Sequence, residues 1–230
     1  MYNQLFNQEL QDKMTHFFLN ELSILGRIKA YDKNSIIDPD NANYIYIVVD
    51  GDLNQVLYSH DGDEIIFCRL ERGNIFGEMD FFDGDRTCIV TKAITACAIS
   101  KVPRALVEER LGKEPDLYKH FIHSIVRKYR IIMLEFADIR FNDSLGKIAH
   151  TLVRLTYSTS KKIHDGEGTL PINMYFTHEE LANRINANRS TITNGLKTFK
   201  EQGYIDIDGK KITVTNIEGL KKYINLYLPE

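Results

Sequence analysis

The spacing of apolar residues along the first half of the chain changes from helical to strand-like. Over residues 4–22, apolar side chains recur every three or four positions, which predicts one or two short helices. From about residue 24 to residue 101, short apolar runs alternate with Asp- and Gly-containing turns. Four glycines there stand 11 residues apart: Gly51, Gly62, Gly73 and Gly84. Such regular turns predict an antiparallel roll or barrel, although ordinary turn glycines can also fall into register by coincidence.

A long helix is predicted after Pro115, following a short one that begins at Pro103. Its apolar residues are spaced alternately four and three apart: Tyr118, Ile122, Ile125, Tyr129, Ile132, Phe136 and Ile139. A seam held at this spacing for about three heptads is what two helices winding around each other require. We therefore predict a parallel dimer helix, and a helix packed only within its own chain is the alternative.

The last third of the chain predicts two short helices and a hairpin. An earlier helix, capped by Asn142 or Asp143, leads into a polar loop. Thr177 then opens a helix over residues 178–185 as part of a capping box, and a polar turn leads to a second helix over residues 189–202. Asp208-Gly209 suits a tight turn between two strands. A helix-turn-helix followed by a hairpin is a winged helix.

The exposed side of the second short helix is rich in short or forked hydrogen-bonding side chains: Arg189, Ser190, Thr193 and Asn194. Arg can bind guanine and Asn can bind adenine through two hydrogen bonds each, and the first residues of a recognition helix reach the base edges. Ser, Thr and Asn are mediocre helix formers, so their concentration favours a contact surface over a merely solvated face. We predict that these four residues read DNA bases.

Composition and charge limit the class of protein. Apolar residues make up 43% of the 230 residues, which is enough for a packed core. Residues 1–144 carry 17 basic and 23 acidic residues, a net of −6, whereas residues 145–230 carry 12 and 9, a net of +3. This asymmetry indicates two modules with different partners. With a polar N-terminus and no apolar run of about 18 residues, we expect a cytoplasmic protein that does not enter membranes.

The three cysteines give no ligand pattern for zinc or iron–sulfur. Cys88 is either a redox thiol or, as we expect, a buried structural cysteine. The roll segment contains only His60 among histidines, in a turn, which disfavours a cupin-like metal enzyme. We expect no metal site and no catalytic residues.

The stretch Phe76–Thr87 places Gly-Glu and Arg-Thr in what reads as one short loop between strands. Gly77 can let a ligand approach the backbone, and Arg86 with Thr87 can hold an anion. The structural alternative is an ion pair of Arg86 with Glu78 or a neighbouring Asp. The residues alone leave both interpretations open.

These pieces, in this order, resemble the Crp/Fnr family of bacterial transcription regulators over nearly the whole chain. The resemblance rests on the strand-rich front segment YIYIVVDGDLNQVLYSHDGDEIIFCRLERGNIFGE, on FNDSLGKIAHTLVRLTY, and above all on FTHEELANRINANRSTITNGLKTFKEQGYI. It implies an α+β chain: an effector-sensing jelly-roll-like β-roll over 1–113, a dimerisation helix over 114–140, and a winged helix-turn-helix over 141–230. It also implies a homodimer that binds palindromic DNA, with RNA polymerase as a further candidate partner.

The resemblance assigns roles to individual residues. Cyclic-nucleotide members of the family hold the ribose and phosphate with residues that match Gly77, Glu78, Arg86 and Thr87, so a cyclic nucleotide is one candidate effector. The effector would also touch the long helix at Tyr129, Ile132 and Met133, although the last two are apolar where cyclic-AMP members carry a polar pair. Arg189 matches a guanine-reading arginine. Four residues match backbone-phosphate contacts: Thr177, Asn188, Thr191 and Lys210.

The identity of the effector remains open. No cysteine precedes Cys68, so the iron–sulfur branch of the family is not expected. No Cys or His stands out as a haem ligand. A constitutive DNA binder whose roll is only a dimerisation scaffold is the rival interpretation.

Overall fold

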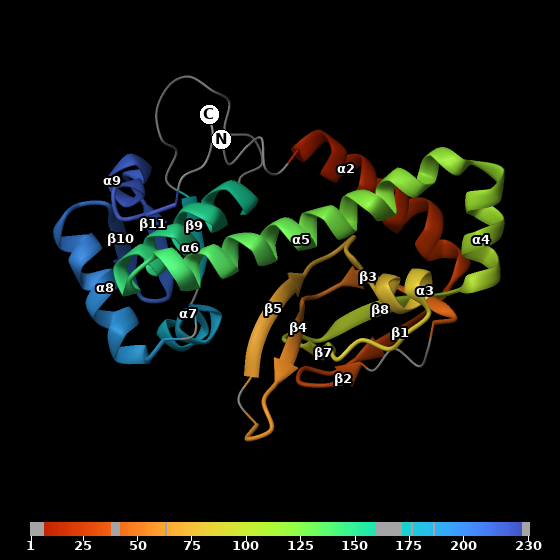
Figure 1. Cartoon of the computed structure of the whole chain (residues 1–230), viewed down its shortest axis with the longest axis horizontal. Helices are drawn as coiled ribbons and strands as arrows, with labels where there is room; N and C mark the ends of the chain where they lie inside the picture. The colour runs from red at the N-terminus through yellow and green to blue at the C-terminus, as the bar shows by residue number, and fades with distance from the viewer. Residues whose placement is uncertain are drawn as a thin grey trace. The chain divides into compact units, whose positions relative to one another are not determined.

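The computed structural model of the protein describes residues 7–37, 42–62, 64–159, 172–175, 177–185 and 187–226. The chain forms two compact units (Figure 1). One spans Asn7–Ile132, and the other contains Met133–Glu230. The long helix α5, Tyr118–Phe141, contributes residues to both. We describe each unit by itself.

The first unit contains two four-stranded antiparallel sheets, in agreement with the predicted roll. Their strand orders are β1-β8-β3-β6 and β2-β7-β4-β5. The first sheet has the strands β1 (Arg27–Tyr31), β8 (Cys97–Pro103), β3 (Tyr44–Asp50) and β6 (Ile75–Phe76). The second has β2 (Ile36–Ile37), β7 (Val90–Ala93), β4 (Leu53–Tyr58) and β5 (Glu64–Leu70).

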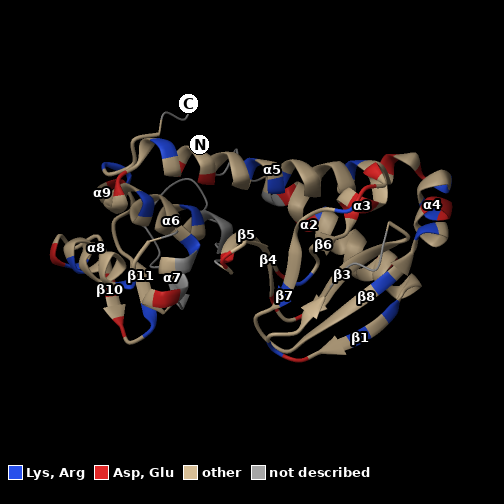
Figure 2. Cartoon of the chain, turned by 60° about the horizontal axis from the view of Figure 1, so that its bottom comes forward, with Lys and Arg blue, Asp and Glu red and all other residues tan. Residues whose placement is uncertain are grey.

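Helices flank these sheets. The predicted N-terminal helix is α2, Gln8–His16, and it continues into a π-helical segment, Phe17–Leu22. Helix α4, Arg104–Lys113, follows Pro103 and carries charges of both signs in Figure 2. These charges form pairs one turn apart, such as Lys113 with Glu109, which stabilise an exposed helix modestly.

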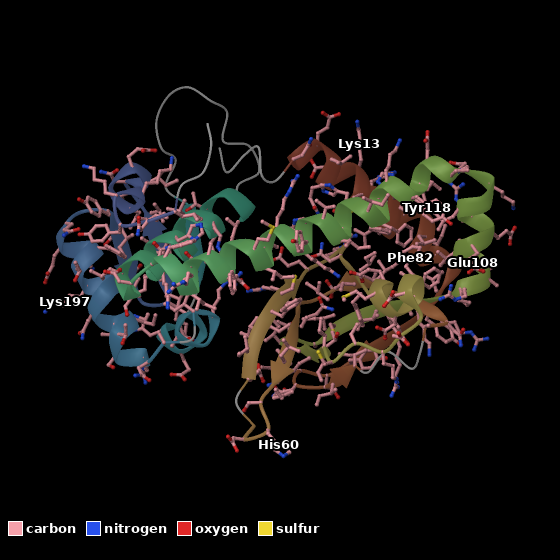
Figure 3. All side chains as sticks on the ribbon, viewed as in Figure 1. Lys13, His60, Phe82, Glu108, Tyr118 and Lys197 are labelled. Carbon is pink, nitrogen blue, oxygen red and sulfur yellow. The ribbon has the colours of Figure 1, made fainter. Side chains whose placement is uncertain are left out.

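Aromatic rings join the N-terminal helices to α5. Phe121 of α5 is 1% exposed and lies edge-on to Phe18, with ring centroids 5.1 Å apart. Phe82 contacts Phe121 in the same way at 5.4 Å, and its ring centroid lies 6.3 Å from that of Tyr118. Figure 3 labels Phe82 and Tyr118. These contacts hold the first turns of α5 against the roll.

The stretch predicted as a loop around Glu78 is in fact a helix. Helix α3 spans Glu78–Asp83 between two glycines in the left-handed region, Gly77 at φ 82° and Gly84 at φ 93°. Two glycines at these φ values start and stop the helix without strain, which a side chain with a Cβ would introduce. Sequence spacing did not reveal it because six residues are too few for a periodic pattern. Gly84 therefore ends a helix rather than a strand.

The second unit contains the predicted winged helix. Its helices are α6 (Ser144–Thr159), α7 (His178–Ile185), α8 (Arg189–Glu201) and α9 (Ile217–Lys221). Its three-stranded antiparallel sheet has the order β10-β11-β9, with strands β10 (Ile205–Asp208), β11 (Lys211–Val214) and β9 (Ile172–Tyr175). The hairpin was predicted from its turn, whereas β9, which pairs with β11, was not.

The core of this unit fixes the orientation of α8. Ile192, Leu196 and Phe199 are fully buried, as the i, i+4, i+7 spacing predicts. Gly195 lies between them, and a Cβ there would stand 2.4 Å from Ile148 of α6. Glycine is unfavourable in a helix interior, but at this position of α8 it allows α6 to pack closely against α8.

Three local expectations are refined by the structure. Asp143, rather than Asn142, caps α6, since its Oδ1 accepts a hydrogen bond from the Gly146 backbone N–H at 2.7 Å. Asn188 occupies the N-cap position of α8, but the described structure gives its side chain no capping hydrogen bond. In the hairpin, Asp208 pairs with Lys211, so the two turn residues are Gly209 and Lys210 rather than Asp208-Gly209. A φ of 58° at Gly209 suits the first position of a primed turn.

Candidate functional site

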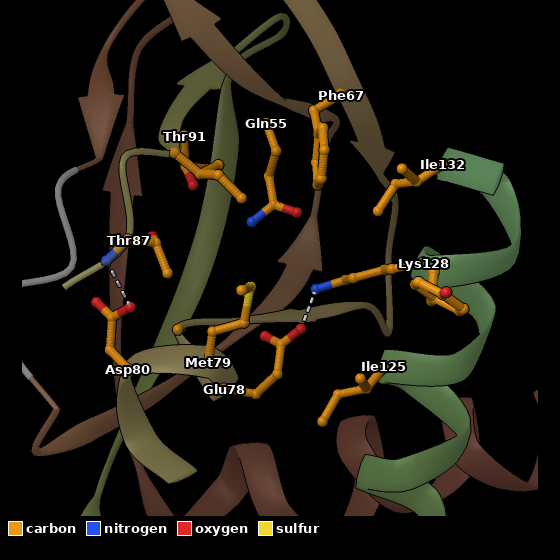
Figure 4. A pocket seen from close by; sticks show the side chains of 13 residues that line it. Gln55, Phe67, Glu78, Met79, Asp80, Thr87, Thr91, Ile125, Lys128 and Ile132 are labelled. Atoms are coloured by element: carbon orange, nitrogen blue, oxygen red, sulfur yellow. Dashed lines mark hydrogen bonds and ion pairs between the residues drawn. The ribbon is translucent and has the colours of Figure 1, made fainter. Parts of the chain in front are cut away.

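The first unit contains a cavity of about 160 Å³ between the second sheet, helix α3 and helix α5, shown in Figure 4. Its wall is mainly apolar, with these apolar or aromatic side chains: Phe67, Met79, Ile89, Ile125, Tyr129 and Ile132. Its remaining lining consists of Gly77 and six polar residues: Gln55, Glu78, Asp80, Thr87, Thr91 and Lys128. A mostly apolar cavity with a few convergent polar groups is typical of a small-molecule site.

A buried ion pair stands in this cavity. The Nζ of Lys128 on α5 lies 2.5 Å from Glu78 Oε1 at the start of α3, and it also donates to the Ile75 carbonyl at 2.8 Å. The side chains are 12% and 3% exposed, respectively. Glu78 is thus already paired within the protein, and Lys128 supplies the positive charge in the cavity wall.

Asp80 and Thr87 form the opposite side of the cavity (Figure 4). The backbone N–H of Thr87 donates to Asp80 Oδ1 at 3.2 Å, which ties the segment after α3 back to the helix. Asp80 is 5% exposed, so its carboxylate is buried beside the cavity. Two carboxylates and one ammonium group therefore line this space.

Five of the seven residues predicted for the effector site line the cavity: Gly77, Glu78, Thr87, Tyr129 and Ile132. The other two, Arg86 and Met133, are not among the lining residues, and both are exposed. Arg86 follows Gly84, the residue that ends helix α3, by two positions.

Eight lining residues were not predicted for the effector site, and two of them left a faint signal in the sequence. Lys128 is a cation within the long helix, next to Tyr129 of the predicted seam. Gln55 is a polar residue at a position of β4 whose side chain is directed to the buried side of the sheet, and it is only 8% exposed. An uncharged polar residue in a buried strand position is an indication of function that the spacing of apolar residues does not provide.

The heptad residues of α5 present an apolar surface. Within the first unit, Ile122 is 58% exposed and Tyr129 is 60% exposed. Within the second unit, Phe136 and Ile139 are 70% and 66% exposed. Large apolar side chains at such exposure, arranged as a stripe, are unusual on the surface of a monomer.

The residues predicted to contact DNA lie on the surface of the second unit. Arg189, Ser190, Thr193 and Asn194 are exposed on α8, and Lys210 is exposed at the tip of the hairpin. Asn188 is exposed directly before α8, while Thr177 and Thr191 are partly buried beside the starts of α7 and α8. Figure 3 shows that Lys197 also projects outward from α8.

One contact in this group was not predicted. The Thr193 hydroxyl donates to the Arg189 carbonyl at 3.0 Å and lies 2.8 Å from His178 Nδ1 at the first turn of α7. His178 therefore links the first helix of the helix-turn-helix to the exposed face of the second.

A buried polar network lies where α5 meets α6 in the second unit. His150 Nδ1 lies 2.5 Å from Asp138 Oδ1, and Asn142 Nδ2 donates to the same oxygen at 2.5 Å. Asn142 Oδ1 in turn accepts from the Asn225 backbone N–H at 2.7 Å. Nearby along α5, burial raises the pKa of Glu135, and the Arg154 guanidinium 3.5 Å away opposes that shift. The end of α5 is therefore fastened to α6 and to the C-terminal segment.

The three cysteines differ in their burial. Cys68 and Cys97 are buried, but Cys88 is exposed, so the expectation that Cys88 is a buried structural cysteine was wrong. Its position in the irregular segment between α3 and β7 leaves it outside the sheets. His60 lies at the tip of the turn between β4 and β5 (Figure 3). The described residues contain no group of three potential metal ligands.

No helix in the described part of the chain has the length and apolar character needed to cross a membrane.

Comparison with known proteins identifies the two units. Residues 31–113 match the cyclic nucleotide-binding domain, and residues 146–223 match the Crp-like helix-turn-helix domain. The chain is 26% identical over 179 residues to the CRP-like cAMP-activated global transcriptional regulator of Mycobacterium tuberculosis, covering 77% of this chain and 78% of that protein. It is 24% identical over 177 residues to the cAMP-activated global transcriptional regulator CRP of Salmonella typhimurium, covering 76% and 82%.

The fold is also that of FixK2 from Bradyrhizobium japonicum. The two structures superimpose with a TM-score of 0.72 at 17% identity, covering 88% of this chain and 99% of FixK2. The relatives are named as transcriptional regulators, and this chain is accordingly a regulator rather than an enzyme. With a cyclic-nucleotide-binding-type roll followed by a Crp-like helix-turn-helix, the chain belongs to the Crp/Fnr family of transcription regulators.

Proposed function

We propose that the protein is a homodimeric, sequence-specific DNA-binding regulator whose affinity for its operator is controlled by a small molecule bound in the cavity of the first unit. The dimer forms along the heptad face of α5. Each winged helix places the start of α8 in a major groove, where Arg189, Ser190, Thr193 and Asn194 meet base edges. RNA polymerase is a further candidate partner at the promoter.

The observation that carries this proposal is the double role of helix α5. Tyr129 and Ile132 line the cavity and also belong to the heptad face. A ligand that fills the cavity therefore touches the same side chains that would pack against the partner's helix. Such a ligand shifts the protein between states only if it binds one of them better, and contact with a dimer-forming helix supplies that difference.

An operator selected from random double-stranded DNA tests the proposal. The expected site is a palindrome with half-sites about one helical turn apart. Arg189→Ala should weaken binding to that site and relax its sequence preference, whereas Lys29→Ala, an exposed change on the roll strand β1, should leave binding unchanged. Operator affinity measured with and without added small molecules then separates a regulated protein from a constitutive binder.

The constitutive alternative makes a distinct prediction. If the roll is only a scaffold, a cavity-filling substitution such as Thr91→Ile should leave operator affinity unchanged. Under effector control, the same substitution should move operator affinity at least severalfold in one direction. Sedimentation of the free protein as a monomer would contradict the homodimer.

A further inference from the structure

The cavity contains a carboxamide for which the described residues provide no hydrogen-bond partner. Gln55 of β4 is 8% exposed, and its side chain points into the cavity in Figure 4. No hydrogen bond to this side chain occurs among the described residues. The polar atoms of this carboxamide are accessible within the cavity rather than sealed in the core, so its donor and its acceptor are available to a ligand that fills the cavity.

A second uncharged polar group stands beside it. Gln55 and Thr91 are direct partners in the antiparallel pairing of β4 with β7, so their side chains lie on the same face of the sheet. Thr91 is 1% exposed, lines the same cavity, and has no side-chain hydrogen bond in the described structure. Together the two residues offer an amide donor, an amide acceptor and a hydroxyl to whatever occupies the cavity.

The charges in the wall disfavour an anion. Lys128 is paired with Glu78, and the Asp80 carboxylate leaves the lining with a net charge of −1. A phosphate would therefore meet two carboxylates and only one cation, which is already engaged. Like charges at such short range in a buried site are strongly unfavourable.

The size of the cavity limits the ligand further. Its volume of about 160 Å³ is close to that of an apolar cavity of roughly 150 Å³ that holds one benzene molecule, whereas pockets for drug-sized ligands measure roughly 300–1,000 Å³. Phe67, Met79 and Ile132 provide the flat and flexible apolar surfaces that a single ring would contact. A ribose, a cyclic phosphate and a purine together are larger than this volume and would have to extend through its open side.

Building on the proposed regulatory role of the cavity, we propose that its effector is an uncharged, single-ring molecule with an amide or lactam edge. That edge pairs with the Gln55 carboxamide through two hydrogen bonds and reaches the Thr91 hydroxyl. The ring lies between the sheet and the α5 side chains, and the Glu78–Lys128 pair stays intact.

Benzamide and benzoate test this assignment because they share a ring and differ in the charge and donors of the polar group. The full-length protein is titrated with each, and with cyclic AMP, while the side-chain amide signals of Gln55 are followed by NMR. Benzamide is expected to shift these signals and to bind at least roughly tenfold more tightly than benzoate, the ratio for one lost hydrogen bond of about 1.4 kcal/mol.

Two variants locate the contact. Gln55→Met keeps the length of the side chain without its donor or acceptor and should weaken benzamide binding about tenfold; Thr91→Val, nearly the same shape, should weaken it severalfold. Asn54→Leu, on the opposite face of the same strand, is the matched control and should leave it unchanged. Tighter binding of benzoate or cyclic AMP than of benzamide overturns the assignment. So does benzamide binding that is indifferent to both Gln55→Met and Thr91→Val.

The experiments distinguish a wrong assignment of the ligand class from a wrong assignment of the regulatory role. If cyclic AMP raises operator affinity while benzamide does not bind, the ligand class is wrong and the regulatory role stands. If benzamide binds through Gln55 but never changes affinity for a selected operator, the ligand class stands and the regulatory role is wrong.

Discussion

Removing Lys128 is the most informative single perturbation of the first unit. Lys128→Met keeps the apolar stem of the side chain but deletes the charge that lies 2.5 Å from Glu78 and the donor to the Ile75 carbonyl. Because Glu78 is only 3% exposed in its side chain, its carboxylate is left buried without a partner. Breaking a buried pair in this way typically costs about 3–5 kcal/mol, and the free energy of unfolding of the roll should fall by that amount.

Hydrogen exchange measures this loss in the first unit alone. A chain with two units need not unfold in one step, so a single global unfolding midpoint would mix their stabilities. The amides of β6, which contains Ile75, and of its partner strand β3 exchange through opening of the roll. A loss of about 3 kcal/mol predicts an increase in their exchange rate of roughly 100-fold.

Two controls isolate the ion pair. Glu78→Gln combined with Lys128→Met removes both charges and should restore most of the stability lost in Lys128→Met, because no buried charge remains. Lys92→Met breaks the Lys92–Glu64 pair, which has a similar length of 2.7 Å but side chains 31% and 28% exposed, and should cost at most about 1 kcal/mol. Equal losses in Lys128→Met and Lys92→Met, or no recovery in the double variant, would refute this account of the cavity.

Three further predictions concern pH, DNA and assembly. Burial lowers the pKa of His120 and of His123. The stability of the folded chain that these neutral histidines allow above about pH 6.5 should therefore be lost as the pH falls below that value. In thermal unfolding between pH 8 and pH 5, a variant with both histidines changed to Gln should lose less stability than the unchanged protein. Arg189→Ala should cost about 1–3 kcal/mol of operator binding and relax specificity at one base pair, whereas Lys210→Ala should weaken all sequences alike and reduce the salt slope by about 1, as read by fluorescence anisotropy. Phe136→Glu should place a charge in the apolar face of α5 and yield monomers in sedimentation, while a persistent dimer would contradict the heptad interface.

Sequence patterns predicted the parts of the fold whose signal is local and periodic. The glycines Gly51, Gly62 and Gly73 all have positive φ, as turns between strands require. Helix α7 was predicted with its observed bounds, because a capping threonine and a polar turn mark its ends. Strand β9 was missed because four residues after a long polar segment carry no alternation of their own.

The candidate site was harder to predict, because its defining contact joins residues 50 positions apart. Nothing near Glu78 in the sequence indicates that Lys128 is its partner. The Gly-Glu and Arg-Thr pairs suggested an anion site; helix α3 runs between them, and Gly77, Glu78 and Thr87 line the cavity whereas Arg86 is not among its lining residues. A motif fixes residue types, whereas the length and conformation of the segment between them decide which side chains meet.

The network around Asp138 has a consequence for how the DNA-reading unit can be separated from the rest of the chain. Asp138 belongs to α5, yet its partner His150 is fully buried within the second unit. A fragment that began at residue 141, where the long helix ends, would leave that imidazole facing a missing carboxylate, at about 1–3 kcal/mol in a fold of marginal stability. The last two turns of α5 therefore belong with the helix-turn-helix unit when that unit is transferred to another protein. A functional chimera with another sensor domain should be joined near Met133.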